Sequence, residues 1–153
     1  MLHVFKHRGD LSMLPALAAV MQGHPPPWLA CADIDAVLAV PLSRERRLYR
    51  GFNQADELVA RLAKHYGWNV LPRDTVFRRP HAPQSTLKRE ERQRNVKQVF
   101  ELEKPLVKNR KLLLIDDVMT TGATLAELSR MLKRAGADRI FCWTLARAKM
   151  KKF

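Results

Sequence analysis

The stretch Leu112–Thr124 constrains the fold of this chain more than any other. It opens with four apolar residues, and such an unbroken run is typical of a strand buried on both faces, as in a parallel sheet. Two carboxylates, Asp116 and Asp117, follow, and we expect them to lie past the end of the strand. A hydroxyl-rich turn, Thr120–Thr124, comes next. Apolar residues then recur at helical spacing as far as Gly136, so the stretch predicts a strand, an acidic pair, a loop and a helix.

The loop of this stretch suits a phosphate group. It lies where a helix starts, so free backbone N–H groups and the positive end of the helix dipole face an anion. Threonine hydroxyls can add hydrogen bonds, and Gly122 lets the backbone approach the ligand. The carboxylates can only accept hydrogen bonds or face a cation, so a sugar diol and a hydrated Mg²⁺ are natural partners. Together these groups suit a ribose 5-phosphate; the alternative is a strand that ends in solvated acids before a threonine-capped helix.

This stretch closely resembles the signature of type I phosphoribosyltransferases, in which two acids and a Thr/Ser-Gly phosphate loop follow an apolar strand. The resemblance implies that Asp116 and Asp117 are the catalytic pair, hold the ribose hydroxyls of phosphoribosyl pyrophosphate and contact a Mg²⁺ cofactor. It also implies that the 5-phosphate is bound by the loop residues Met119, Thr120, Thr121, Gly122, Ala123 and Thr124.

An arginine-rich segment follows a second predicted strand, Ile34–Val40. Four of the seven residues in Arg44–Arg50 are arginines. Loops at the carboxyl ends of sheet strands bind ligands in α/β proteins, and arginines there suit polyphosphate oxygens. A solvated basic turn is the alternative. By position, the pyrophosphate loop of the phosphoribosyltransferases corresponds to Pro41–Arg47, and the substrate-binding residues expected in this region are Pro41, Leu42, Ser43, Arg44 and Arg50.

The stretch 78–97 carries seven basic residues, two acids and two prolines. A basic loop of this length within a compact domain is usually functional or mobile, so we expect a mobile basic loop that closes over an anionic substrate or lies on a nucleic-acid backbone. A disordered, solvated loop is the alternative. The loop residues singled out for such a role are Gln84, Arg89, Arg92 and Asn95.

The rest of the chain alternates helix and strand patterns. We expect helices after Asp10 and after Asn53, and further strands at Thr75–Phe77 and Ile140–Leu145. This alternation favours an α/β fold with a parallel sheet flanked by helices, and 153 residues suit a single domain spanning 1–153. The phosphoribosyltransferase resemblance adds that 78–97 forms a flexible hood loop.

The charge and the cysteine content indicate which partners and which cellular compartment suit the chain. The formal charge is +13, and the basic tail 147–153 adds to it, so we expect an anionic partner such as a polyphosphate, a nucleic acid or an acidic membrane surface. A general solubility charge is the alternative. No apolar run approaches the roughly 20 residues that span a bilayer, and no signal peptide is evident. Cys31 and Cys142 lie in apolar surroundings and predict buried, reduced thiols in a cytoplasmic protein rather than a zinc site.

Shorter motifs narrow the resemblance. Lys6–Asp10, Arg50–Ala55 and the spaced residues Gln84, Leu87, Arg92, Asn95 and Phe100 all resemble the ComF competence family. That family is a bacterial branch of the phosphoribosyltransferase fold, associated with DNA uptake and the use of external DNA. Its members usually begin with a cysteine-rich zinc ribbon, which this sequence lacks. We expect that the ribbon was lost or that the chain is truncated.

Two functions of different classes follow. The first is a ComF-like phosphoribosyltransferase that binds phosphoribosyl pyrophosphate and Mg²⁺ and acts in nucleotide metabolism or DNA uptake. Catalysis would rest on positioning and on stabilising the leaving pyrophosphate, and no residue stands out as a general base. The alternative is a non-enzymatic competence factor that binds single-stranded DNA and keeps the phosphoribosyl pocket for sensing or structure. Single-stranded DNA and competence proteins are the candidate macromolecular partners, although aromatic residues for base stacking are sparse near the basic loops.

Overall fold

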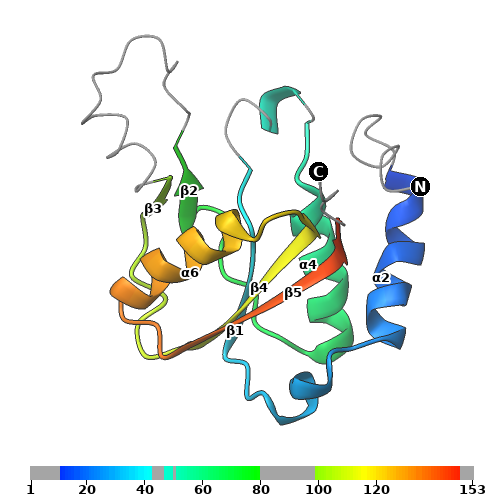
Figure 1. Ribbon diagram of the computed structural model, residues 1–153, viewed down its shortest axis with the longest axis horizontal. Helices are drawn as coiled ribbons and strands as arrows, with labels where there is room; N and C mark the ends of the chain where they lie inside the picture. Colours follow the sequence, from blue (N-terminus) through cyan, green and yellow to red (C-terminus); the bar gives the residue numbers. More distant parts are fainter. Residues whose placement is uncertain (1–10, 43–46, 50, 80–98, 149–153) are drawn as a thin grey trace, which may run out of the picture.

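A parallel three-stranded sheet, in the order β1-β4-β5, forms the centre of the fold (Figure 1). The computed structural model describes residues 11–42, 47–49, 51–79 and 99–148, and the structural statements below refer to these. The strands are β1 (Ala36–Ala39), β4 (Lys111–Met119) and β5 (Arg139–Arg147). Their register places Ile115 of β4 between Ala39 and Trp143. The predicted α/β class with a parallel sheet is confirmed.

Strand β4 is central because its apolar run is buried on both faces. Side chains alternate between the two faces along a strand. Leu113 and Ile115 pack with α2 (Leu14–Gly23) and α4 (Gln54–Tyr66) on one face. Leu112 and Leu114 pack with α6 (Ala123–Arg134) on the other. Helices therefore cover both faces of the sheet, with α6 on one side and α2 and α4 on the opposite side (Figure 1).

Helix α4 has well-defined ends that agree with the sequence. The side chain of Asn53 accepts a hydrogen bond from the Ala55 N–H, which satisfies one of the free donors of the first turn. At the other end, Gly67 adopts a φ of 71°, the left-handed conformation that ends helices and favours glycine. Helix α2 is preceded by the short 3₁₀ turn η1 (Leu11–Met13) and followed by η2 (Pro27–Cys31).

A small antiparallel ribbon stands apart from the central sheet. It pairs β2 (Val76–Arg78) with β3 (Phe100–Leu102), so that Val76 lies opposite Leu102. The short strand expected at Thr75–Phe77 is therefore present. It pairs with a strand that the sequence analysis did not identify rather than joining the parallel sheet. The ribbon lies beside α6 (Figure 1).

The structure corrects two expectations. The acidic pair does not lie past the end of β4, because the strand continues to Met119. Pairing with β5 supplies backbone partners for this extension, as the register Met119↔Arg147 shows. The two cysteines are exposed rather than buried: Cys31 lies in η2, outside the packed core, and Cys142 lies on β5, at the edge of the described sheet, with its Sγ 3.9 Å from Ser129 Oγ of α6. Among the described residues, no helix is long and apolar enough to cross a membrane.

Candidate functional site

The acidic pair projects beyond the end of the neighbouring strand. The last residue pair between β1 and β4 is Ala39 with Ile115, so Asp116 and Asp117 occupy the part of β4 that passes β1. Adjacent strand residues point to opposite faces. Asp116 therefore lies on the face of α6, and Asp117 lies on the face of α2 and α4. Both are partly buried.

Local hydrogen bonds hold both carboxylates against their own strand. The Asp117 N–H donates to Asp116 Oδ1 at 2.9 Å, and the Val118 N–H donates to Asp117 Oδ1 at 2.7 Å. Carboxylates oriented in this way can accept hydrogen bonds from hydroxyl groups or face a hydrated cation. The opposite orientations mean that the two acids have different neighbours, although they are adjacent in sequence.

Asp116 and the predicted phosphate loop come together in one small depression of about 40 Å³. The loop residues expected to bind phosphate all line it: Met119, Thr120, Thr121, Gly122, Ala123 and Thr124. The structure thus brings one acid and the whole loop to the same place, at the carboxyl end of β4. Asp117 is not among the lining residues.

The loop geometry leaves donors free at the start of α6. Gly122 is the N-cap residue and has a φ of 80°, a conformation that favours glycine. Thr121 Oγ1 accepts a hydrogen bond from the Ala123 N–H at 3.3 Å. The N–H groups of Thr124 and Leu125 have no acceptor in the described part of the chain. Such free amides, with the positive end of the helix dipole, favour an anion at this position.

The first residues of the predicted pyrophosphate loop lie elsewhere. Pro41 and Leu42 follow β1 and line a separate cavity of about 430 Å³, which shares no lining residue with the depression. Arg47 lines the same cavity. The remaining predicted site residues fall outside the described residues, so their places stay predictions: Ser43, Arg44, Arg50, Gln84, Arg89, Arg92 and Asn95.

Asn53 has a second role that the sequence analysis did not assign. Its side-chain Nδ2 donates to the Val40 carbonyl at 3.1 Å, while its Oδ1 caps α4. It is 7% exposed. One buried side chain therefore ties the end of β1 to the start of α4 and fixes both ends of the arginine-rich connection. The only sequence signal was its place before the apolar helical pattern.

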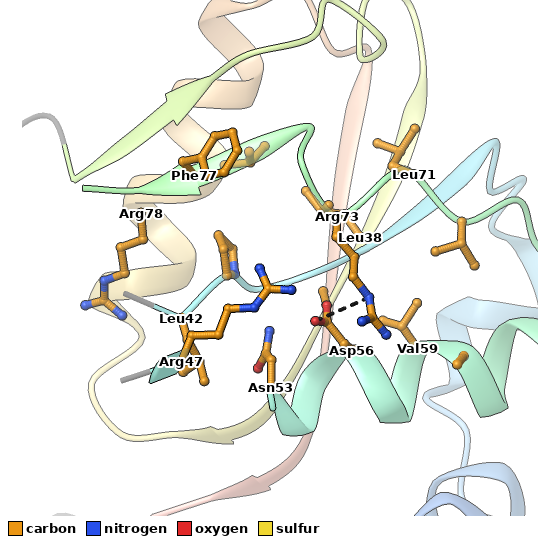
Figure 2. A pocket seen from close by; sticks show the side chains of 15 residues that line it. Leu38, Leu42, Arg47, Asn53, Asp56, Val59, Leu71, Arg73, Phe77 and Arg78 are labelled. Carbon is orange, nitrogen blue, oxygen red and sulfur yellow. Dashed lines mark ion pairs between the residues drawn. The ribbon is translucent and has the colours of Figure 1, made fainter. Parts of the chain in front are cut away.

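The cavity also contains charged residues that the sequence analysis did not identify (Figure 2). Asp56 on α4 and Arg73 form an ion pair with an Oδ2–Nε distance of 3.6 Å. Burial raises the pKa of Asp56 above its ordinary value of 3.8, and the positive charges of Arg73 and Arg47 partly offset this effect. No local motif marks these residues, because the ion pair forms only when the chain after α4 folds back over that helix.

Comparisons with known proteins agree with this geometry. A parallel α/β sheet whose central strand carries an acidic pair and leads into a hydroxyl-rich loop is the arrangement expected of a phosphoribosyltransferase-type protein. The family profile described as "Phosphoribosyl transferase domain" matches residues 48–152. Solved structures share the fold at low sequence identity. A glutamine phosphoribosylpyrophosphate amidotransferase from B. subtilis aligns with a TM-score of 0.60 at 13% identity, over 88% of this chain and 26% of that chain. An adenine phosphoribosyltransferase aligns with a TM-score of 0.56 at 16% identity, over 92% of this chain and 72% of that chain.

Sequence relatives narrow the class. The DNA utilization protein YhgH of Escherichia coli K12 is 40% identical over 116 residues, which cover 74% of this chain and 49% of the relative. Competence protein F of Haemophilus influenzae is 39% identical over 121 residues, covering 74% and 51%. The chain thus spans about half the length of these relatives. It belongs to the ComF family of phosphoribosyltransferase-type proteins, which is linked to DNA utilization and competence.

Proposed function

We propose that this chain binds phosphoribosyl pyrophosphate together with Mg²⁺ and transfers the phosphoribosyl group to an acceptor in the context of DNA use. The observation that carries the proposal is the meeting of Asp116 with the loop 119–124 in one depression at the carboxyl end of β4. The free amides at the start of α6 would bind the 5-phosphate. Asp116, one residue pair beyond the end of β1, would accept hydrogen bonds from the ribose hydroxyls. Asp117 would act from the opposite face of the strand.

The donor set fits Mg²⁺ only if the substrate shares in holding the ion. Among the described residues, no group of three or more His, Cys, Asp or Glu side chains could hold a metal. Mg²⁺ commonly binds through one or two carboxylates together with substrate phosphates and water. Asp116 or Asp117 would therefore hold the ion only when pyrophosphate is present. When bound, Mg²⁺ would neutralise charge that develops on the leaving pyrophosphate.

The chemistry is a substitution at the anomeric carbon of the ribose. The bond from this carbon to the pyrophosphate oxygen breaks, the pyrophosphate leaves with the electron pair, and the acceptor forms the new bond. The residues of the chain would position the ribose and the 5-phosphate while the carbon carries partial positive charge. Carboxylates beside the ribose would also stabilise that positive charge, because opposite charges attract more strongly in a partly buried site.

Calorimetric titration of phosphoribosyl pyrophosphate, with and without Mg²⁺, tests this proposal. We expect saturable binding to the wild-type protein that is stronger with Mg²⁺. The double variant Asp116→Asn/Asp117→Asn should lose this binding and retain the wild-type circular dichroism spectrum and cooperative unfolding. A double variant that is folded and binds phosphoribosyl pyrophosphate with unchanged affinity would refute the site assignment.

Sequence-independent binding of single-stranded DNA is the second candidate function, and the observation that favours it is the net charge of +13. A surplus of this size attracts the nucleic-acid backbone, and such binding weakens steeply as salt rises. Fluorescence anisotropy of a labelled oligonucleotide at several salt concentrations separates the two functions. DNA binding that persists in the Asp116→Asn/Asp117→Asn variant would assign it to a surface other than the phosphoribosyl site.

A further inference from the structure

The cavity of about 430 Å³ lies at the edge of β1 that faces away from β4 (Figure 2). On this edge, β1 pairs only through Val37, whose N–H donates to the Asn69 carbonyl and whose carbonyl accepts from the Leu71 N–H. Beyond Val37, this edge has no paired strand in the part of the chain that the structure describes. The space beside the last residues of β1 is instead enclosed by α4 and β2. Its volume is in the range that binds small organic molecules.

One part of the cavity wall is apolar. Residues from four different segments contribute to it: Leu38 from β1, Val59 from α4, Leu71 from the connection between α4 and β2, and Val76 and Phe77 from β2. Phe77 is 42% exposed, which is unusual for a phenylalanine that lines a cavity in a folded domain. The aliphatic residues of this wall offer a surface against which a flat group can pack, whereas the Phe77 ring lies on the side of β2 that points away from Arg47 and Asp56 (Figure 2).

The polar groups of the cavity are mostly cationic. Three arginines and one carboxylate line it: Arg47, Arg73, Arg78 and Asp56. Arg73 is engaged with Asp56, and Arg78 lies over the ring of Phe100, with its guanidinium carbon 5.8 Å from the ring centre. Arg47 makes no ion pair with any described residue, and Figure 2 shows its side chain reaching into the space between α4 and β2. Arg47 is therefore the group best placed to bind an anion.

Asp56 adds a second polar requirement. Its side chain is 13% exposed, and a carboxylate held in this way can only accept hydrogen bonds. The molecule that satisfies the whole cavity has an anionic group for Arg47, a flat apolar body for the aliphatic wall, and an N–H donor for Asp56. A nucleotide combines these features: its phosphate is anionic, its base stacks, and the base carries amino or imino N–H groups.

We propose that this cavity is a nucleotide-binding site, distinct from the depression at Asp116, in which the base packs against the aliphatic wall, an N–H of the base donates to Asp56 and the phosphate binds Arg47. The nucleotide is either a free mononucleotide or one residue of a single strand, because both present the same chemistry. Pro41, Leu42 and Arg47 line the cavity and belong to the segment that the family resemblance assigns to pyrophosphate. Coupling between the two ligands would rest on the proposed function; nucleotide binding itself does not.

A cavity-filling variant gives the sharpest test. Ala60 lines the cavity from an exposed position on α4, so Ala60→Trp should place an indole in the space without disturbing the core. Ala19 is an exposed residue of α2 outside the cavity, and Ala19→Trp is the matched control. Calorimetric titrations would use the ribonucleoside and deoxyribonucleoside monophosphates and a short oligothymidylate. Thermal unfolding checks that both variants are folded.

We expect at least one of these probes to bind the wild-type protein and the Ala19→Trp control. Ala60→Trp should weaken that binding by about tenfold or more, because the indole occupies the ligand's place. Binding of the oligothymidylate alone, lost in Ala60→Trp, would identify the nucleotide as part of a strand. No binding of any probe at concentrations up to about 1 mM, or equal affinity in Ala60→Trp, would overturn the proposal. A parallel titration of phosphoribosyl pyrophosphate separates this outcome from a failure of the proposed function, because Ala60 is not among the residues that line the Asp116 depression.

Discussion

Replacing Asn53 by alanine should destabilise the domain more than a typical helix-cap substitution, because this side chain makes two buried hydrogen bonds. Loss of the cap to the Ala55 N–H accounts for about 1 kcal/mol. Loss of the Nδ2 donor leaves the Val40 carbonyl without its side-chain partner, which costs about 1–2 kcal/mol at a buried position. The free energy of unfolding should therefore fall by about 2–3 kcal/mol.

Urea unfolding, followed by circular dichroism, measures this loss of free energy. In thermal unfolding, the midpoint temperature should fall by about 4–12 °C in a domain of this size. Asn53→Ser is the matched control, since its hydroxyl can cap α4 while the Nδ2 donor to Val40 is lost. It should lose less stability than Asn53→Ala. A decrease below about 0.5 kcal/mol in Asn53→Ala would refute the reasoning, because changes of that size are usual at ordinary surface positions.

Three further outcomes are expected. Gly122→Ala should lower the free energy of unfolding by about 1–2 kcal/mol in denaturant titrations, because a φ of 80° is unfavourable for a residue with a Cβ atom; no loss would contradict this. Burial raises the pKa of Asp56 in the folded state above 3.8, so the folded state binds the carboxyl proton more tightly than the unfolded state does. The contribution of Asp56 to stability therefore falls as pH rises from the unfolded-state pKa to the folded-state pKa. The stability of Asp56→Asn relative to wild type should therefore rise between about pH 4 and pH 7, and an opposite trend in urea titrations would refute it. If the basic tail binds single-stranded DNA, replacing three lysines with glutamine should flatten the salt dependence by roughly two units of slope in anisotropy titrations, and an unchanged slope would exclude the tail; the lysines are Lys149, Lys151 and Lys152.

Local sequence patterns predicted the centre of the fold well. The apolar run of β4 correctly indicated a strand buried on both faces, since only a central strand between two helical layers buries all of its side chains. The ends of α4 were also clear from the sequence, because Asn53 and Gly67 act through bonds and backbone angles within one turn of the helix. Both kinds of signal depend on neighbouring residues alone.

Features that depend on distant pairing were missed. Strand β3 is three residues long, and its register with β2 joins Val76 to Leu102, so no local periodicity could reveal it. The extension of β4 through the acidic pair depends on β5, which lies further along the chain. The exposure of Cys142 likewise follows from the position of β5 at the edge of the described sheet. The cavity beside β1 likewise depends on distant pairing, because it begins where β1 no longer pairs with the segment at Val70.

The candidate site was predicted where chemistry and chain order coincide. Asp116 and the predicted phosphate loop are contiguous in sequence, so their meeting at the end of β4 follows from a strand that leads directly into a helix. The cavity draws its charged groups from three separate segments, and Arg47, Asp56 and Arg73 become neighbours only through tertiary structure.

The two pockets adjoin the carboxyl ends of neighbouring strands, β1 and β4. One edge of β1 pairs with β4, which carries the acids, and its other edge bounds the cavity. The carboxyl end of β1 continues into Pro41 and Leu42. Asn53 fixes the far end of the connection between β1 and α4 to Val40. A ligand bound to Arg47 and a pyrophosphate bound by the predicted loop Pro41–Arg47 would therefore contact the same short segment. If both proposed ligands bind, each should change the affinity for the other by the same factor, because thermodynamic coupling between two sites is reciprocal.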